Sequence, residues 1–485
     1  MKTQVIDKNT ERKEVAAEEA RKQIKFIKML REIIREKKER LGRNITASVI
    51  TFGCQMNERD SEKLKGILIE SGYELIEDEE EADFVLYNTC TVRENANMRL
   101  YGRLGALNKT KKTNPEKIIG VCGCMAQEPD VVEKLEKSYG FVDVIFGTFN
   151  VYKLAEILYS RLTSGTRIID IWESNENFVE LLPTERKYSF KSGINIMYGC
   201  DNFCTYCIVP YVRGREKSRT PEDIVEEIKG LVDNGVVEVM LLGQNVNSYG
   251  KGLGEGVTFS GLLKQIEAIE GLKRIRFMTP HPKDFSDELI EVCSQSEKIC
   301  KHIHLPVQSG SSRILKKMNR SYSKESYLEL VKKIREKIPG VSLTTDIIVG
   351  FPGETEEDFE ETLDVVRKAG YDSAFTFIYS KRTGTPAASM EGLPDKEVVD
   401  RRFSRLLEEV RKGSRARSGQ LIGQTLEVLA EGVNDHDPSL LTGRLSNNML
   451  VHFPGDESMI GKIMPVEIEE SKGFYYFGKR KDRFC

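Results

Sequence analysis

The sequence lacks any long hydrophobic run, and it has almost no net charge. Its 485 residues contain nothing close to the ~18 consecutive apolar residues that a membrane-spanning helix needs. The charged N-terminal region also lacks the apolar segment of a secretory signal peptide. We therefore expect a cytoplasmic chain with no membrane partner. A net charge of −3 excludes a global positive field, so binding to nucleic acid would need local basic patches.

Two stretches of the chain are locally basic. Residues 401–420 contain seven Arg or Lys against two Glu, and residues 11–43 contain twelve basic against seven acidic residues. Charge runs of this kind usually form the solvated, ion-paired face of a helix. Composition alone favours that interpretation for both stretches.

Length and periodicity divide the chain into several parts. At 485 residues it is too long for one hydrophobic core. Residues 1–44 carry apolar residues at helical spacing and predict an amphipathic helical extension. In residues 45–163, strand-like runs ending at Cys54, Cys90 and Cys124 alternate with helical segments. This alternation predicts a Rossmann-like parallel α/β domain.

The remainder of the chain predicts two further domains, after a linker near residues 164–188. Residues 186–416 contain six strand-like runs, most of them separated by helices. Six units are fewer than the eight of a closed TIM barrel, so we expect a partial (β/α)6 barrel. The short strands of residues 419–482, punctuated by Gly and Asn, predict a small antiparallel β-barrel. The six runs are 194–199, 237–243, 274–279, 302–307, 342–350 and 373–380.

Three of the ten cysteines form a compact motif, Cys200-x3-Cys204-x2-Cys207, directly after a predicted strand. Disulfides are not expected because cytosolic thiols stay reduced, which favours metal binding or catalysis. A structural zinc site usually has four ligands, but His281 is the nearest downstream His and no fourth Cys lies close. Three ligands leave an open position, which in a [4Fe–4S] cluster is one iron free to bind a cofactor. A zinc site is the alternative.

Three other cysteines are dispersed in sequence. Cys54, Cys90 and Cys124 each lie at the carboxyl end of a predicted parallel strand, the edge where α/β sheets bind their ligands. They can therefore converge in space. The alternative is that they are buried core residues, as free cysteines often are. Cys122 competes with Cys124, because strand alternation puts both on the same side.

The motif with Tyr206 before its third cysteine resembles the signature of radical S-adenosylmethionine enzymes, whose fold is a partial barrel. With both cysteine groups in view, the chain after residue 44 resembles the methylthiotransferase family. This resemblance implies two [4Fe–4S] clusters. It assigns one to Cys200, Cys204 and Cys207 and an auxiliary one to Cys54, Cys90 and Cys124, which leaves Cys122 in the core. The motifs that carry it are TFGCQMNERDSE, NTCTVRENA, CGCMAQ, RGREKSR, HLPVQSGS, MNRSY and FTFIYSKRTGTPAA.

Within the family, GCQMNERDSE and RENAN most resemble the branch that adds a methylthio group at C2 of N6-isopentenyladenosine 37 of tRNA. The resemblance then implies a tRNA anticodon stem-loop as partner and a TRAM RNA-binding domain at residues 419–482. Sister branches act on N6-threonylcarbamoyladenosine in tRNA or on a ribosomal protein, and they are the enzymatic alternatives. An iron–sulfur electron carrier or RNA-binding sensor without catalysis is the alternative from another class.

The family mechanism implies two uses of S-adenosylmethionine. One molecule methylates sulfur attached to the auxiliary cluster, and another supplies the radical that opens the C2–H bond. An external electron donor of the flavodoxin or ferredoxin type and a sulfur source are also implied. We expect a monomer.

Fold position predicts the residues that contact S-adenosylmethionine, because the strand ends of such a barrel face the active site. For the glycines among them, tight turns are the alternative. The predicted contacts are Tyr206, Gln244, Asn245, Gln308, Ser309, Asp346, Gly350 and Gly353.

The basic run gains a second meaning because it adjoins the predicted RNA-binding module, where cations can contact backbone phosphates. Aromatic residues of the barrel are candidates for stacking on bases, although half of them are expected in its core. The predicted phosphate contacts are Arg401, Arg402, Arg405, Arg411, Lys412, Arg415 and Arg417. The stacking candidates are Phe453, Phe474, Tyr475, Tyr476 and Phe477.

Overall fold

The computed structural model describes residues 8–91, 94–174, 179–180 and 182–481, so the first seven residues of the predicted extension lie outside it. The chain forms two compact units. The first combines the residues up to Lys187 with the short segment Ile208–Arg215, and the second combines Tyr188–Cys207 with the residues from Glu216 onward. In the described part of the chain, no helix is both long and apolar enough to cross a membrane.

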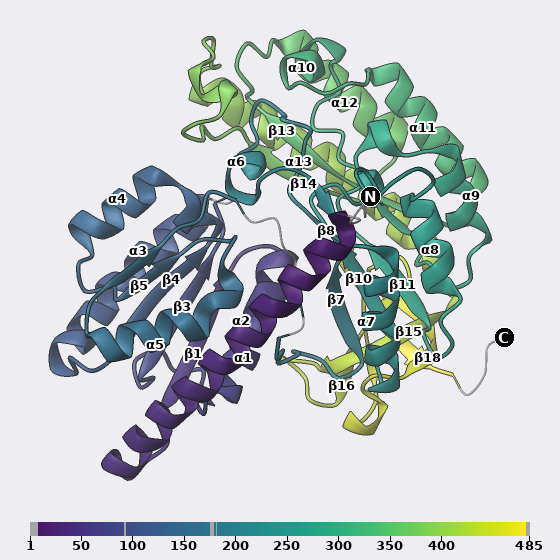
Figure 1. Ribbon diagram of the computed structural model, residues 1–485. Coiled ribbons are helices and arrows are strands. Elements are labelled where there is room, and N and C mark those ends of the chain that lie inside the picture. The colour runs from purple at the N-terminus through teal and green to yellow at the C-terminus, as the bar shows by residue number, and fades with distance from the viewer. Residues whose placement is uncertain (1–7, 92–93, 175–178, 181, 482–485) are drawn as a thin grey trace, which may run out of the picture. The chain divides into compact units, whose positions relative to one another are not determined.

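The first unit is built on a six-stranded parallel sheet with the strand order β2-β1-β3-β4-β5-β6. Figure 1 labels β1, β3, β4 and β5 of this sheet. The two central strands, β3 and β4, are buried along their whole length, which explains why they read as continuous apolar runs. The strands are β1 (Thr46–Phe52), β2 (Glu74–Leu75), β3 (Phe84–Thr89), β4 (Ile118–Gly123), β5 (Val144–Phe146) and β6 (Ile168–Asp170).

Helices cover both faces of this sheet. Leu30, Leu64 and Leu158 place α1, α2 and α5 in one apolar cluster, whereas Leu104 and Leu135 place α3 and α4 in another. These helices are α1 (Lys8–Leu41), α2 (Gln55–Glu70), α3 (Glu94–Thr113), α4 (Pro129–Ser138) and α5 (Leu154–Ser164). The helix predicted for the N-terminal extension is confirmed.

The charges of α1 fasten it to the first unit. Arg31 pairs with Glu70 at 2.6 Å, and Lys22 pairs with Glu156 at 3.1 Å. Both partners lie on neighbouring helices, α2 and α5. These cations of the basic run therefore have the ion-paired role that its composition favours.

The sheet extends further along the chain than predicted. Strand β6 lies inside the stretch 164–188, which the sequence analysis treats as a linker. The strand has only three residues, and none of its side chains is fully buried. Such a segment is too short to show the alternation by which strands are detected.

The second unit contains six parallel strands in two sheets of three, ordered β11-β10-β7 and β12-β13-β14. An isolated parallel bridge between Ile275 and Ile299 lies between them. The strands are β7 (Lys191–Asn195), β10 (Glu238–Leu242), β11 (Arg274–Phe277), β12 (His302–His304), β13 (Ser342–Val349) and β14 (Ser373–Ile378). The number of strands predicted for the partial barrel is confirmed. Its first run is split, because β8 (Met197–Tyr198) pairs separately with β9 (Lys217–Ser218).

Seven helices of the second unit follow the described strands. They are α7 (Pro221–Asp233), α8 (Phe259–Glu267), α9 (Asp287–Gln295), α10 (Ser312–Lys317), α11 (Lys324–Lys337), α12 (Glu356–Ala369) and α13 (Lys396–Ser418). As predicted, α7 begins after the N-cap Thr220, whose hydroxyl accepts a hydrogen bond from the Asp223 amide.

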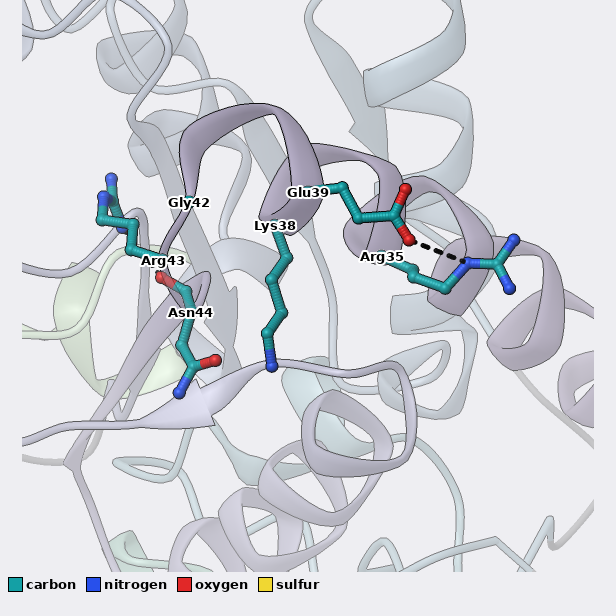
Figure 2. A pocket seen from close by; sticks show the side chains of 6 residues that line it. All are labelled: Arg35, Lys38, Glu39, Gly42, Arg43 and Asn44. Carbon is teal, nitrogen blue, oxygen red and sulfur yellow. Dashed lines mark hydrogen bonds and ion pairs between the residues drawn. The ribbon is translucent and has the colours of Figure 1, made fainter.

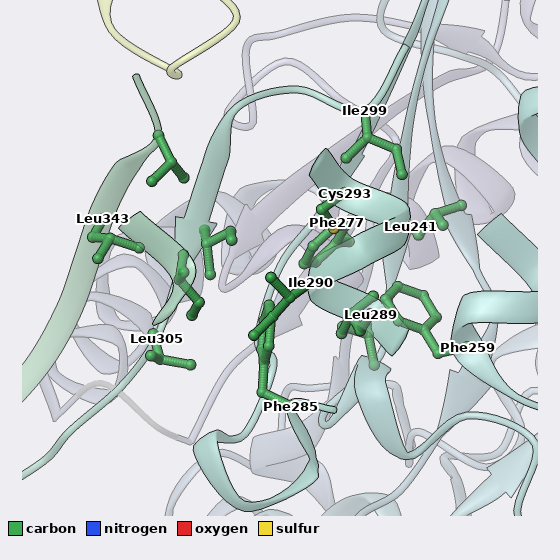
Figure 3. Packing of buried hydrophobic residues seen from close by; sticks show 14 of the residues in the cluster. Leu241, Phe259, Phe277, Phe285, Leu289, Ile290, Cys293, Ile299, Leu305 and Leu343 are labelled. Carbon is green, nitrogen blue, oxygen red and sulfur yellow. The ribbon is translucent and has the colours of Figure 1, made fainter. Parts of the chain in front are cut away.

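Strand alternation separates two faces of this barrel. Leu343, Ile347 and Val349 of β13 lie in the apolar core shared with the surrounding helices, part of which Figure 3 shows. Because successive side chains of a strand point to opposite faces, Asp346 and Ile348 lie on the other, inner face.

The C-terminal strands form a closed barrel with the order β15-β16-β17-β19-β18, in which four of the five strand pairs are antiparallel. Within the second unit, Arg274 and Arg276 of β11 connect the partial barrel to this closed barrel by donating to the carbonyl oxygens of Arg444 and Leu445, both at 2.8 Å. Its strands are β15 (Thr425–Val433), β16 (Leu440–Leu445), β17 (Leu450–Pro454), β18 (Ile463–Ser471) and β19 (Tyr475–Arg480). The three predicted architectures are therefore confirmed, except that β17 and β19 pair in parallel.

Candidate functional site

The loop with Cys200, Cys204 and Cys207 lies in the second unit and is tightly held. Phe203 has a positive φ of 44°, and the Asn319 side-chain amide donates to the carbonyl oxygens of Asn202 and Phe203 at 3.1 and 3.0 Å. These bonds stabilise a backbone conformation that a bulky residue rarely adopts. The loop is thus fixed by the segment that follows α10.

The thiols of this loop lie in a buried, cationic environment. Cys200 and Cys204 are buried and Cys207 is partly exposed. Burial raises the pKa of Cys200 to about 11, so its thiol stays protonated at neutral pH until a metal displaces the proton. The guanidinium of Arg320 lies 3.7 Å from Cys204 Sγ and also donates to the Pro306 carbonyl at 3.2 Å.

The register of the first unit brings the dispersed cysteines to one edge of its sheet. Thr89 of β3 pairs with Phe52 on one side and with Gly123 on the other. Cys90 and Cys124 follow these strand ends directly, and Cys54 follows Phe52 by two residues as the N-cap of α2. The three residues therefore share the carboxyl edge of the sheet, as predicted.

Side-chain amides connect the loops that carry Cys54 and Cys90. Asn57 accepts a hydrogen bond from the Cys54 amide at 3.4 Å and donates to the Thr89 carbonyl at 3.2 Å. The Asn88 side chain returns a bond to the Asn57 carbonyl at 2.8 Å. Both amides are fully buried, so this network fixes the two strand ends relative to each other.

Cys122 and Cys124 occupy different environments although strand alternation cannot separate them. Cys122 lies within β4 and is fully buried in the apolar cluster of α1, α2 and α5. Cys124 lies beyond the strand, starts a short 3-10 helix (Cys124–Gln127), and packs against Ile208 and Val212. Burial raises the pKa of Cys124, and the nearby Arg213 guanidinium opposes this increase.

The chemistry of the donor sets suits iron–sulfur clusters, because each set consists of three thiols. Among the described residues, no three His, Cys, Asp or Glu side chains converge on the position of one metal ion. A structural zinc needs four ligands around a single point. A [4Fe–4S] cluster takes each thiolate on a different iron, so its ligands surround a larger volume. Three thiols per group would leave one iron of such a cluster open to a further ligand.

Unsatisfied polar atoms lie at the strand ends of the second unit. Asn245, after β10, and Asn195, at the end of β7, are each 1% exposed. The side-chain oxygen of each has no hydrogen-bond partner among the described residues, and the same holds for Nε of Arg320. A buried unsatisfied polar group costs about 1–3 kcal/mol, so these atoms indicate a polar ligand. Asn195 was not predicted from the sequence, because it lies within a strand rather than after one.

Four of the predicted S-adenosylmethionine contacts lie on the inner barrel face, in the cysteine loop or after a strand end. Asp346 lies on the inner barrel face, and its carboxylate is 3.5 Å from Nε2 of His304. Tyr206 packs beside Ile348 in the small cluster next to the cysteine loop. Gln244 follows β10, and Gln308 is buried with a positive φ of 68°.

The remaining predicted contacts have structural roles in the described chain. Ser309 is fully buried, and its hydroxyl accepts a hydrogen bond from the Ser311 amide at 3.2 Å. Gly350 and Gly353 have positive φ angles of 79° and 76°. A Cβ on Gly350 would lie 2.9 Å from the Val399 side chain, so tight turns explain these glycines.

The predicted phosphate contacts on α13 divide into paired and free cations. Arg402 is buried against Glu354 and Glu356, Arg405 pairs with Glu356 at 2.6 Å, and Arg417 lies 3.8 Å from Asp372. The other four are exposed and make no ion pair within the described residues. They are Arg401, Arg411, Lys412 and Arg415.

The aromatic stacking candidates divide into residues of the barrel core and residues at the barrel surface. Phe453 and Tyr476 belong to the barrel core, as expected for about half of them. Phe474 is exposed, and Tyr475 and Phe477 lie 5.0 and 5.7 Å from the ring of His452. The last two rings and His452 form an aromatic group at the barrel surface.

Figure 2 shows a pocket of about 610 Å³ at the end of α1. It lies near the start of β1, at the sheet edge opposite the cysteines. Its cations are largely engaged, since Arg35 pairs with Glu32 at 2.5 Å and Arg43 with Asp83 at 2.7 Å. The pocket is therefore separate from the candidate site.

Comparisons with known proteins first define the class. A model of the radical SAM superfamily matches residues 194–366, one of the uncharacterized protein family UPF0004 matches 46–147, and the TRAM domain matches 419–480. The fold resembles the radical S-adenosylmethionine methyltransferase TsrM of Kitasatospora setae, solved with cobalamin and a [4Fe–4S] cluster, with a TM-score of 0.52. That likeness covers 71% of this chain and 74% of the other at 15% identity, and it shows the fold. The class is a radical S-adenosylmethionine protein with a TRAM domain.

Curated relatives define the family. The tRNA-2-methylthio-N(6)-dimethylallyladenosine synthase of Lachnoclostridium phytofermentans is 64% identical over 441 residues, which cover 91% of this chain and 96% of the relative. The synthase of the same name from Acetivibrio thermocellus is 51% identical over 458 residues, 94% of this chain and 95% of the relative. The chain belongs to this family of radical S-adenosylmethionine methylthiotransferases. S-adenosylmethionine and [4Fe–4S] clusters are the cofactors that go with it.

Proposed function

We propose that this chain adds a methylthio group to C2 of N6-dimethylallyladenosine, also called N6-isopentenyladenosine, at position 37 of tRNA. The observation that carries the proposal is the pair of three-cysteine sites, one at the sheet edge of the first unit and one in the loop of the second. A sulfur-inserting enzyme needs one site for radical generation and another for sulfur. The names of relatives that are 64% and 51% identical support the choice of substrate.

Each group of cysteines has a role in this proposal. Cys200, Cys204 and Cys207 hold the cluster that binds S-adenosylmethionine, and Cys54, Cys90 and Cys124 hold the auxiliary cluster. When bound, these groups supply a carbon radical strong enough to open the aromatic C2–H bond, the sulfur atom and the methyl group. Side-chain acids and bases cannot do this alone, because that hydrogen is not acidic.

The surrounding residues bind and orient the cofactor. Asn195 and Asn245 present buried oxygens without partners in the described chain, which suit the amino and hydroxyl groups of S-adenosylmethionine. Asp346 lies on the inner face of the barrel, and Tyr206 belongs to the cysteine loop itself. Gln244 and Gln308 are further candidates at the strand ends. Ser309, Gly350 and Gly353 shape the loops around them.

The tRNA contacts in this proposal are electrostatic and aromatic. Arg401, Arg411, Lys412 and Arg415 are the exposed cations of α13 that contact phosphates. The aromatic group around His452 offers faces on which bases can stack. Residue 37 lies in an anticodon loop, where little unpairing is needed.

The proposed reaction needs further partners. An external reductant of the flavodoxin or ferredoxin type supplies electrons, and a sulfur source restores the sulfur that each turnover consumes. We propose that the protein acts as a cytoplasmic monomer, where tRNA is available.

The substrate is tested in tRNA from a strain that lacks the gene. Digestion to nucleosides should show the loss of 2-methylthio-N6-isopentenyladenosine and the accumulation of N6-isopentenyladenosine, reversed by the wild-type gene. Persistence of the methylthiolated nucleoside would contradict the proposal. Loss of the threonylcarbamoyl methylthio nucleoside instead would indicate the sister branch.

A further inference from the structure

Eight residues that follow the cysteine loop in sequence belong structurally to the first unit. The segment Ile208–Arg215 lies within the stretch matched by the radical SAM model, yet it clusters with the N-terminal α/β domain. It contains the short helix α6 (Val209–Arg213), which packs against the 3-10 helix that begins at Cys124. The auxiliary site is therefore completed by a segment from outside its own sequence domain.

Arg213, the last residue of α6, lies between a thiol and a carboxylate. Its Nε donates to Cys124 Sγ at 3.3 Å, and its Nη2 pairs with an Asp60 oxygen at 3.0 Å. The Arg213 side chain is 5% exposed and that of Asp60 is 8% exposed. Asp60 lies on α2, the helix that Cys54 caps.

A buried cation needs compensation, because taking a charge out of water is costly. Asp60 supplies that compensation through its ion pair with Arg213 at 3.0 Å. One carboxylate is enough to balance the guanidinium. A different nitrogen of the guanidinium donates to the Cys124 sulfur, and a thiolate bound to iron would be a stronger, anionic acceptor for that bond.

We propose that Arg213 is a positioning residue of the auxiliary cluster, in which it holds Cys124 Sγ by a charge-assisted hydrogen bond and makes the cluster easier to reduce. This inference rests on the proposed ligand role of Cys124. Reduction adds a negative charge, which a nearby cation stabilises, and hydrogen bonds to cluster sulfurs act in the same direction. Asp60 moderates the effect because it carries the opposite charge.

The test isolates this cluster in the full-length chain. Replacing Cys200, Cys204 and Cys207 by Ala leaves one cluster and about four irons per chain. Arg213→Met and Asp60→Asn are then compared in that background by a redox titration followed by electron paramagnetic resonance. Arg161→Met is the matched control, because Arg161 pairs with Asp143 at 2.7 Å just before β5, at the opposite sheet edge.

The two variants should shift the midpoint potential in opposite directions. For Arg213→Met we expect the equilibrium constant for reduction of the cluster to fall about tenfold. For one electron this is a fall of about 59 mV in the midpoint potential. Asp60→Asn keeps an oxygen that accepts the bond but loses the charge, so its potential should rise. A merely structural role would give iron loss, or shifts of one sign, in both variants.

Each outcome bears on a different claim. Full iron with unchanged potentials in both variants would overturn the role of Arg213. If Arg213→Met loses iron, the rise expected for Asp60→Asn and a smaller fall for Arg213→Lys decide the question. A parent variant without iron would instead overturn the proposed ligands Cys54, Cys90 and Cys124. The titration contains no tRNA, so it is independent of the proposed substrate.

A second inference concerns the inner face of β14. Phe375 and Phe377 are 55% and 45% exposed although they lie in a strand of the barrel. They pair with Asp346 and Ile348 of β13, whose side chains lie on the inner face, so the two phenyl rings lie there as well. The Phe375 ring contacts His304 edge-on at 5.8 Å.

This exposed pair lies next to the candidate cofactor site. Ile348, the partner of Phe377, packs in the small cluster that contains Tyr206 of the cysteine loop. Exposed aromatic side chains beside convergent polar groups are typical of a ligand site rather than of a free surface. A ligand here would have both an aromatic and an aliphatic part to cover two phenyl rings.

We infer that Phe375 and Phe377 bind the dimethylallyladenine base, with the purine against one ring and the aliphatic N6 group against the other. This inference rests on the proposed substrate, whose N6 group is the apolar feature that distinguishes it from adenosine. The two residues would then determine specificity for the modified base.

The test compares two tRNA stem-loops, one with N6-dimethylallyladenosine and one with adenosine. For Phe377→Ala and Phe375→Ala we expect the binding preference for the modified stem-loop to fall about tenfold, whereas Phe375→Tyr retains it. Leu393→Ala, an exposed apolar residue elsewhere in the same unit, is the control. An unchanged preference in both Ala variants would overturn the inference. No preference in the wild type would instead contradict the proposed substrate.

Discussion

The two cysteine sites of this protein are built by opposite means. In the second unit, three cysteines lie within eight residues of one loop. Hydrogen bonds from the Asn319 side chain to the loop backbone stabilise its conformation. In the first unit, three cysteines come from three strand ends, and the register of a parallel sheet brings them together. The first kind of site depends on local conformation, whereas the second depends on the whole domain.

The charges around the two sites differ as well. Arg213 contacts Cys124 and is balanced by Asp60. Arg320 lies 3.7 Å from Cys204 and makes no ion pair with a carboxylate in the part of the chain that is described. An unbalanced cation stabilises added negative charge more strongly than a balanced one.

Removing a proposed ligand should separate the two sites most sharply. Cys204→Ala should abolish both S-adenosylmethionine cleavage and methylthiolation, because radical generation is lost. Cys54→Ala should abolish methylthiolation but retain 5′-deoxyadenosine formation. Chromatographic assays of both products, with iron and sulfide analysis, check this, and the wild type should contain about eight irons per chain. Methylthiolation by Cys54→Ala protein would contradict the assignment.

Cys122→Ala is the matched control for the first site. Cys122 is a fully buried cysteine two residues from Cys124, but it lies in the apolar core rather than at the edge. It should keep the iron of both clusters and lose only some stability. Loss of half the iron in this variant would make Cys122 the ligand in place of Cys124.

The next largest effect is expected at the cation of the second site. Arg320→Met should lower the rate of S-adenosylmethionine cleavage roughly 10–100-fold, because it removes the donor beside Cys204 Sγ. Arg335→Met is the control, since the partners of Arg335 in α11 are carbonyl oxygens, such as that of Gly370 at 2.7 Å, and the Asp372 carboxylate at 3.8 Å rather than a thiol. Equal cleavage rates in the two variants would contradict this prediction.

Because the first site depends on the fold of its domain, a substitution at a strand end there should lower the stability of the protein. Gly123 has a φ of 94°, and a Cβ there would lie 2.5 Å from the Thr89 carbonyl oxygen. Gly123→Ala should destabilise the protein by about 1–3 kcal/mol from backbone strain alone. Urea unfolding checks this against Gly140→Ala, where a Cβ would meet no atom within 4 Å. Equal stability of the two variants would contradict the structural role of Gly123.

The contrast between the sites also explains what could be predicted from the sequence. Periodicity places Cys54, Cys90 and Cys124 at strand ends, because parallel strands read as apolar runs and their carboxyl ends share an edge. It does not find Arg213, although that residue lies in a recognised motif. Its contacts with Cys124 and Asp60 arise from packing between segments that are 89 and 153 residues apart.

Local backbone geometry limits prediction elsewhere. Ser309 follows a barrel strand, like the other expected cofactor contacts. The positive φ of Gln308 interrupts the extended backbone just before it, and Ser309 bonds to the segment before α10. Strand β6 escapes detection because three residues, none of them fully buried, are too few to show a period.

Helix α13 gives the smallest predicted effect and shows why a charge run cannot be interpreted from composition. Arg405 and Arg411 belong to the same basic run. Arg405 pairs with Glu356 and Glu360, which lie more than forty residues away in the sequence. Arg411 is exposed and makes no ion pair within the described residues. If free cations contact tRNA, Arg411→Ala should weaken binding a few-fold for every tRNA and lower the salt slope by about 1.

Arg405→Ala is the control, because its charge is already neutralised within the protein. Filter binding at several salt concentrations distinguishes the two variants, since a lost phosphate contact changes the slope and a lost internal ion pair does not. Slopes that change equally would mean that tRNA displaces Glu356 and Glu360 from Arg405. In that case the whole basic face of α13, rather than its free cations alone, contacts the RNA.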